Sequence, residues 1–271
     1  MTQRSSPRAA LDLRLAYRAT SILLCLHSRM TYSKSPLTEA LVEIRTKDSV
    51  PFERLSFFDE LVKADFPRSQ SRYQAEGQFL LEENPTASIE KRPFSRMYFS
   101  RDEKYIFQAA TDGIVLSRLA PYQSWDMFYP ELQKLWRLYK SEVHVGTVRR
   151  IAARYINQLH FQASRVDIEE YLKTRPEISN DIPIQLRDTS FYALQLVFPQ
   201  QDIKGVMVIN QSVIPPTKPD TVSIILDLDL YIEGLDLRTD DEIWLRLEQI
   251  RQRKNQYFEA CITEKYREMI R

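Results

Sequence analysis

Three closely spaced strand-like segments near the end of the chain constrain the fold more than any other sequence feature. They are rich in Val, Ile and Tyr, which suit a pleated surface, and they span residues 190–199, 204–213 and 222–233. A helix-like segment, 239–270, follows them, and Thr239 with Glu242 forms a capping box at its start. A helix of about thirty residues spans a sheet or exceeds it, which leaves a face for a partner.

Strand and helix patterns also alternate through the rest of the chain. The first half gives the order β-α-β-β-β-β-α, and the second half begins with strand 148–161 and repeats this order loosely. The predicted fold is therefore α+β, with mostly antiparallel sheets in two related β-α-β(n)-α units and a long C-terminal helix. The elements expected in the first half are strands 37–46 and 77–83, three short strands within 95–119, and helices 51–67 and 124–143.

The two predicted units cover residues 30–145 and 146–271, and the N-terminal segment 1–29 differs from both. This segment contains five Arg and one Asp, and its single apolar run is too short for a membrane span. Met30 offers a second plausible start that leads directly into strand 37–46. Residues 1–29 are therefore predicted to be an upstream extension or a disordered tail.

Composition excludes several classes of function. The net charge of +1 produces no global attraction to nucleic acid or to an anionic membrane. The five glycines are too far apart for a phosphate-binding glycine loop. Two cysteines and three scattered histidines argue against a disulfide framework and a zinc site. We therefore expect a cytoplasmic protein without a cofactor.

Four segments resemble a known family. PLTEALVEIR, ARYIN, LDLDLY and FEACITEKYREM occur here in the order in which a sporadically distributed bacterial family of uncharacterised conserved proteins carries similar motifs. The resemblance covers Pro36 to about Met269, and Ala153 stands where Leu is usual. It implies a chain of about 250 residues that begins at Met30. It implies no activity, and it suggests a gene context near mobile-element or defence modules.

The most informative polar residues lie on two of the predicted strands. Alternation places Arg150 and Arg154 on one face of strand 148–161 and Asn157 on the apolar face. In strand 222–233, Asp227 and Asp229 share a face. If the two strands belong to one sheet, Arg154 can form a bidentate ion pair with either aspartate. The alternative is a ligand-binding site made of Arg150, Arg154, Asn157, Asp227 and Asp229.

Other chemistry remains open from the sequence. Asp227 and Asp229, with Glu233 as a third ligand, are weak candidates for holding Mg²⁺ through carboxylate oxygens. Glu39 and Glu43 share the polar face of strand 37–46, where a solvated face is the simpler interpretation of a carboxylate pair.

The absence of a catalytic signature favours a non-enzymatic binding or regulatory protein. It would act through a cleft between the two units and through a C-terminal helix that binds a protein partner or a second copy in a homodimer. The alternatives are a Mg-dependent nuclease or phosphodiesterase that uses Asp227 and Asp229, and a nucleic-acid-binding protein. The latter would use the basic part of the last helix, although neighbouring acids favour a solvated face there. No membrane association is expected.

Overall fold

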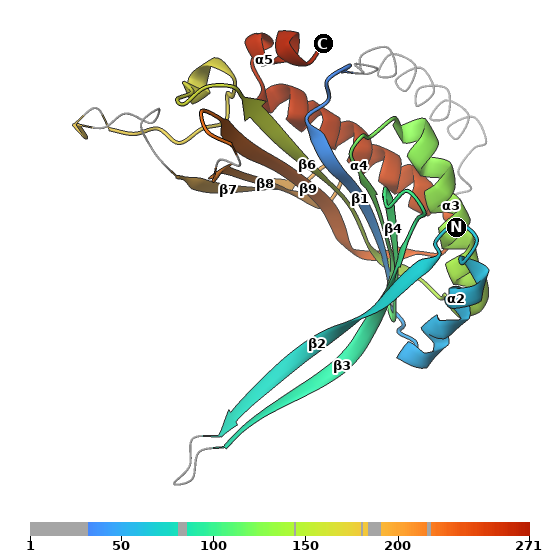
Figure 1. The fold of residues 1–271 in the computed structure, drawn as a ribbon. Coiled ribbons are helices and arrows are strands. Elements are labelled where there is room, and N and C mark those ends of the chain that lie inside the picture. Colours follow the sequence, from blue (N-terminus) through green and yellow to red (C-terminus); the bar gives the residue numbers. More distant parts are fainter. Residues whose placement is uncertain (1–31, 81–85, 144, 180, 184–190, 216–217) are drawn as a thin grey trace, which may run out of the picture.

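The chain folds into one antiparallel sheet with helices on one side of it (Figure 1). The computed structural model describes residues 32–80, 86–143, 145–179, 181–183, 191–215 and 218–271, so the predicted N-terminal extension lies outside the described residues. The strands are β1 (Leu37–Thr46), β2 (Arg68–Leu80), β3 (Thr86–Phe99), β4 (Tyr105–Ala110), β5 (Gly113–Leu119), β6 (Val148–Phe161), β7 (Ala193–Gln200), β8 (Gly205–Ile214) and β9 (Val222–Leu237). The helices are η1 (Phe52–Phe57), α2 (Phe58–Leu61), α3 (Trp125–Val143), η2 (Ile168–Glu170), α4 (Asp240–Cys261) and α5 (Glu264–Ile270).

The predicted fold class was wrong, because the strands form one continuous sheet and not separate sheets in two units. The nine strands lie in the order β2-β3-β4-β5-β1-β6-β9-β8-β7. The first strands of the two predicted units, β1 and β6, are hydrogen-bonded neighbours from Leu37 opposite Asn157 to Thr46 opposite Val148. Each of these strands has a buried apolar face and would otherwise leave a row of backbone groups unpaired. Pairing them joins the two halves, so no cleft separates the units at this seam.

The C-terminal helix is also shorter than predicted. Helix α4 has 22 residues and ends before Ile262, whose extended backbone forms a bridge with Leu172. A separate helix, α5, then starts behind Thr263, whose side chain accepts a hydrogen bond from the Tyr266 amide. The expected capping box at Thr239 and Glu242 is confirmed. No helix in the described part of the chain is long and apolar enough to cross a membrane.

The hydrophobic core lies between the sheet and the helices. Alternate residues of each central strand point to this side, and α3 and α4 cover them with stripes of buried apolar side chains. Burial of these side chains is the main stabilising contribution. Among those with no exposed surface are Val42, Ile44, Phe107, Leu116, Trp136, Ile151, Leu228, Leu230, Leu247 and Ile250.

Strands β2 and β3 form a long two-stranded ribbon that projects beyond the rest of the sheet (Figure 1). Only the last part of β3, Ser95–Phe99, pairs with β4. The sequence predicted a shorter strand, 77–83, because the polar run at 68–74 shows no apolar alternation. The helix predicted for 51–67 is likewise shorter, and it consists of η1 and α2.

Candidate functional site

The side of the sheet opposite the helices carries polar side chains, and we call it the open face. Neighbouring residues across the strands share this face through their register. Its central members are Glu39, Leu41 and Glu43 of β1, Arg150, Ala152, Arg154 and Ile156 of β6, Asp227, Asp229, Tyr231 and Glu233 of β9, and Val208 and Asn210 of β8.

Arg154 forms a bidentate pair with Asp227, one of the two partners that the sequence left open. Arg154 Nε lies 2.9 Å from Asp227 Oδ1, and Nη2 lies 2.7 Å from Oδ2. Asn210 Nδ2 donates a further hydrogen bond of 3.1 Å to Oδ2. The Asp227 side chain is 5% exposed and that of Arg154 is 44% exposed. Asp227 is thus a buried, fully bonded carboxylate, and Arg154 covers it from the solvent side.

Asp229 has a different environment, although it lies directly opposite Arg154 across the strands. Within the described residues, its carboxylate has no hydrogen-bond or ion-pair partner. Burial raises the pKa of Asp229 to about 6. The positive charges of Arg150 and Arg154 oppose this shift without cancelling it, and the negative charges of Asp227 and Glu43 add to it. A half-buried carboxylate without a partner is the least satisfied charge on the open face.

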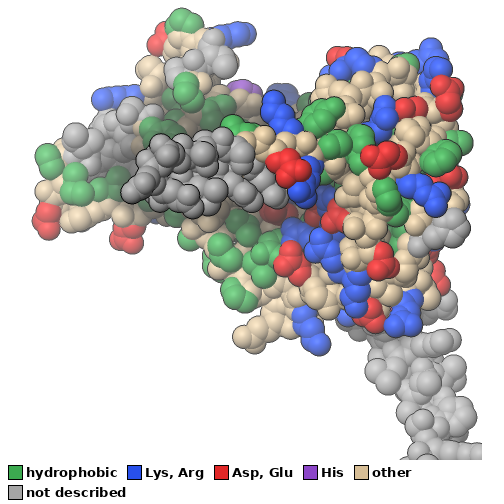
Figure 2. Space-filling model, turned by 90° about the horizontal axis from the view of Figure 1, so that it is seen from below, with side chains coloured by type: hydrophobic (Ala, Val, Ile, Leu, Met, Phe, Trp, Pro, Cys, Tyr) green, Lys and Arg blue, Asp and Glu red, His purple; other side chains and the backbone are tan. Residues whose placement is uncertain are grey.

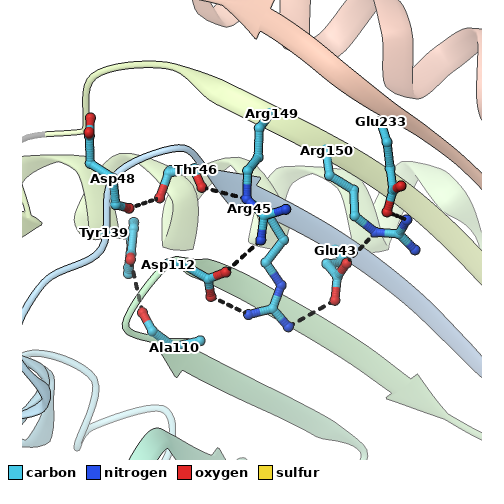
Figure 3. Close-up of polar contacts among 10 residues, drawn as sticks. All are labelled: Glu43, Arg45, Thr46, Asp48, Ala110, Asp112, Tyr139, Arg149, Arg150 and Glu233. Atoms are coloured by element: carbon cyan, nitrogen blue, oxygen red, sulfur yellow. Dashed lines mark hydrogen bonds and ion pairs between the residues drawn. The ribbon is translucent and has the colours of Figure 1, made fainter.

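A chain of ion pairs joins side chains of β1, β6 and β9 (Figure 3). Arg45 Nη2 and Arg150 Nε both bind Glu43, at 2.8 and 2.9 Å. Arg150 also bonds Glu233, and Arg45 bonds Asp112 at 2.7 Å. Burial works to raise the pKa of Glu43, but its two guanidinium partners outweigh burial and lower the pKa. Glu43 is therefore fixed in a network and does not form a carboxylate pair with Glu39.

The geometry gives little support to a metal site at Asp227, Asp229 and Glu233. Asp227 is occupied by Arg154 and Asn210, and Glu233 by Arg150. In the described part of the chain, no group of three or more His, Cys, Asp or Glu side chains is arranged to hold a metal ion. Asp229 by itself offers too few oxygen ligands for Mg²⁺.

Asn157 lies apart from the other four candidate residues. It is 4% exposed on the helix side of β6, where its Nδ2 donates to the carbonyls of Leu226 and Tyr155, at 3.0 and 3.3 Å. This amide satisfies backbone groups between β6 and β9. The open face therefore unites Arg150, Arg154, Asp227 and Asp229 and excludes Asn157.

The basic residues of the last helix are mostly engaged within the protein. Arg251 binds Glu248 through both Nε and Nη2, and Arg253 binds Asp202. Arg246 bonds Gln249, and Lys254 is buried. On the face shown in Figure 2, Lys and Arg side chains are interspersed with Asp and Glu and do not gather into one stripe. The internal ion pairs and hydrogen bonds of these α4 residues do not favour nucleic-acid binding through this helix.

Sequence reasoning missed two residues that define the charge distribution. Asn210 lies on the open face of β8. Strand alternation puts it on the same face as Val206 and Val208, which lie opposite Tyr231 and Asp229 of β9. Lys254 shares the apolar stripe of α4 with Leu247 and Ile250, so helical spacing could have placed it in the core. No protein-family model matches the chain, and no curated protein matches it.

Proposed function

We propose that this chain is a non-enzymatic binding protein whose open face accepts a cationic group of a partner protein at Asp229. The unpartnered, half-buried Asp229 carboxylate carries the proposal. Desolvated ionisable groups of this kind gather at functional sites, because a fold that needed only stability would avoid them.

Charge complementarity identifies the chemistry of the partner. The central members of the open face and their ion-pair partners include six carboxylates, Glu39, Glu43, Asp112, Asp227, Asp229 and Glu233. Four guanidinium groups, Arg45, Arg149, Arg150 and Arg154, oppose them. Among these acids, Glu39 and Asp229 have no ion-pair partner in the described residues. The surplus negative charge favours a Lys or Arg side chain, and a guanidinium can bind a carboxylate through two hydrogen bonds.

Apolar side chains beside Asp229 and beside Arg154 strengthen such an ion pair. Val208 of β8 lies opposite Asp229 on one side, and Leu41 of β1 lies opposite Arg154 on the other. A side chain that docks here displaces water from a surface with a low local dielectric, which increases the Coulombic attraction. The aliphatic stem of Lys or Arg also packs favourably on Val208.

The test is a binding titration with a defined probe. The probe is the blocked tripeptide acetyl-Gly-Arg-Gly-amide. Its counterpart with citrulline in place of arginine keeps the side-chain shape but lacks the charge. Amide chemical shifts around Asp229 and Val208 should change and saturate with the arginine peptide, and the Asp229→Asn variant should lose the response. Asp236→Asn is the matched control, since Asp236 lies on the same strand and already binds Lys47. Equal responses to both peptides, or an unchanged response in Asp229→Asn, would overturn the proposal.

The proposed binding depends on pH, because the Asp229 carboxyl ionises. A cation binds the charged form of Asp229, which predominates above about pH 6. Affinity for the arginine peptide should therefore fall about tenfold for each pH unit below that value. Affinity that stays constant between about pH 5 and pH 7 would contradict a role for this carboxylate.

A further inference from the structure

The two edges of the sheet differ in how they are protected. Strand β2 forms one edge and carries the charged side chains Arg68 and Arg72, with a register irregularity between Arg72 and Tyr73. Charges and bulges on an edge strand prevent another strand from pairing with it. These two features of β2 oppose its pairing with a strand of another molecule.

Strand β7 forms the other edge and has almost no such protection. Its sequence, ALQLVFPQ, contains no charged residue, and it pairs with β8 without a register shift from Ala193 to Gln200. Val197 is 55% exposed and Phe198 is 38% exposed, on opposite faces of the strand. Pro199, which has no N–H to donate, lies near one end. Within the part of the chain that the structure describes, the segment before Pro199 is a regular, neutral strand with no partner strand on its outer edge.

We propose that β7 pairs antiparallel with β7 of a second copy of this chain. A two-fold axis brings the same residues of both strands together, so an uncharged strand meets an uncharged strand without repulsion. The net charge of +1 adds little repulsion between whole molecules. A partner strand that carries charged residues would leave those charges against Leu194, Leu196 and Phe198 on the helix side of β7.

The position of Pro199 determines the register. Pro is tolerated in a sheet where its nitrogen faces away from the neighbouring strand, so the N–H groups of Ala193, Gln195 and Val197 also point outward. All three N–H groups form hydrogen bonds to the second copy in one register. In it, Gln195 lies opposite Gln195 of the second copy and Ala193 lies opposite Val197. On the helix side, Leu194 then meets Leu196, and Phe198 meets Tyr192. The pair places the two Asp229 carboxylates on one continuous face. They lie about 28 Å apart, because five strand spacings of about 4.8 Å combine with an offset of four residues, about 14 Å, along the strands.

The interface is small, so the association should be weak and dependent on concentration. Sedimentation velocity of the full chain at roughly 1 to 500 µM should show a mass that rises from 32.0 kDa towards twice that value. Val197→Lys places a charge on the open edge and should keep the chain at the monomer mass throughout. Tyr73→Lys, at an equally exposed position on β2, is the control and should associate like the wild type.

A second variant tests the register. Gln195→Cys should form a disulfide-linked dimer under mild oxidation, because residues in a hydrogen-bonded antiparallel pair have Cα atoms about 5.5 Å apart. The control Tyr73→Cys should form much less. A monomer at every concentration, or a dimer insensitive to Val197→Lys, overturns the proposal. The readout is molecular mass, so the result is independent of whether Asp229 binds a cation.

Discussion

Two charged side chains without ion-pair partners in the described residues lie on opposite sides of the same sheet. Lys254 lies on the buried side of α4, where it is 3% exposed and its Nζ is 3.1 Å from the centroid of the Tyr155 ring, whereas Asp229 lies on the open face. Burial lowers the pKa of Lys254 well below its usual range, and the charge of Arg251 adds to this effect. The same physical cause raises the pKa of Asp229.

Lys254 and Asp229 differ in whether a ligand can reach them. Lys254 is buried between α4 and the sheet, with its amine against the Tyr155 ring, so no ligand can reach it. Asp229 has no helix above it in the described part of the chain, so a partner can reach it. An unpaired charge therefore indicates a binding site only where the surrounding structure leaves room for a ligand.

The largest expected effect separates the two sides of the sheet, at Leu228 of β9 and at Val208 of β8. Leu228→Ala removes a fully buried side chain between Asp227 and Asp229 and should lower the free energy of unfolding by about 2–5 kcal/mol. Val208→Ala on the open face should lower it by less than about 1.5 kcal/mol. Urea denaturation of both variants measures the difference. Equal losses would contradict the assignment of the core to the helix side.

The next effect concerns the charge pair on the open face. Arg154→Met leaves the buried Asp227 carboxylate without its guanidinium and should lower the free energy of unfolding by about 1–3 kcal/mol, less than for a fully enclosed pair. The double variant Arg154→Met/Asp227→Leu should recover most of this loss, because no charge remains uncompensated. Denaturation of the single and double variants forms the test, and an equally unstable double variant would argue against it.

Lys254→Met should stabilise the protein by about 1–3 kcal/mol near pH 7, because it replaces a desolvated amine with an apolar side chain of similar length. The native pKa of Lys254 is lowered, so the unfolded chain binds more protons and the wild type gains stability as pH rises towards about 10. The variant should show a smaller gain over that range. Melting temperatures from about pH 7 to pH 10 would reveal it, and parallel curves would be the contrary result.

Asp229→Asn should have the smallest effect on stability, a gain of about 1 kcal/mol at pH 7. The folded pKa of about 6 lies above the unfolded value, so Asp229 contributes stability below about pH 4 that is lost as pH rises through 6. The variant should therefore match the wild type near pH 4 and exceed it near pH 7. Urea denaturation at both pH values measures this, and a loss of stability at pH 7 would show that Asp229 has an internal partner.

Local patterns in the sequence were sufficient for most strands and for a pair between Arg154 and one of two aspartates, Asp227 or Asp229, of which the structure shows Asp227. Strand alternation places these side chains on one face, and a buried carboxylate requires a partner. The single sheet could not be predicted in this way, because the pairing of β1 with β6 joins residues more than one hundred positions apart. Nothing local in either strand specifies which neighbour it takes.

The end of α4 shows a second limit of the sequence pattern. The apolar spacing continues through Cys261 and Ile262, so periodicity predicts one helix to residue 270. The bridge from Ile262 to Leu172 ends the helix instead, and this contact depends on the connection after β6. The difference between Asp227 and Asp229 likewise depends on Asn210 of β8, which no pattern within β9 reveals.

The pKa of the Asp229 carboxyl, measured by carbon NMR with and without the arginine tripeptide, tests the central claim most directly. We predict a value near 6 in the free protein and a fall of one unit or more when the peptide saturates the site, because the guanidinium stabilises the charged form. The citrulline peptide should leave the value unchanged. A pKa near 4 in the free protein, or one that the arginine peptide does not move, would contradict the account.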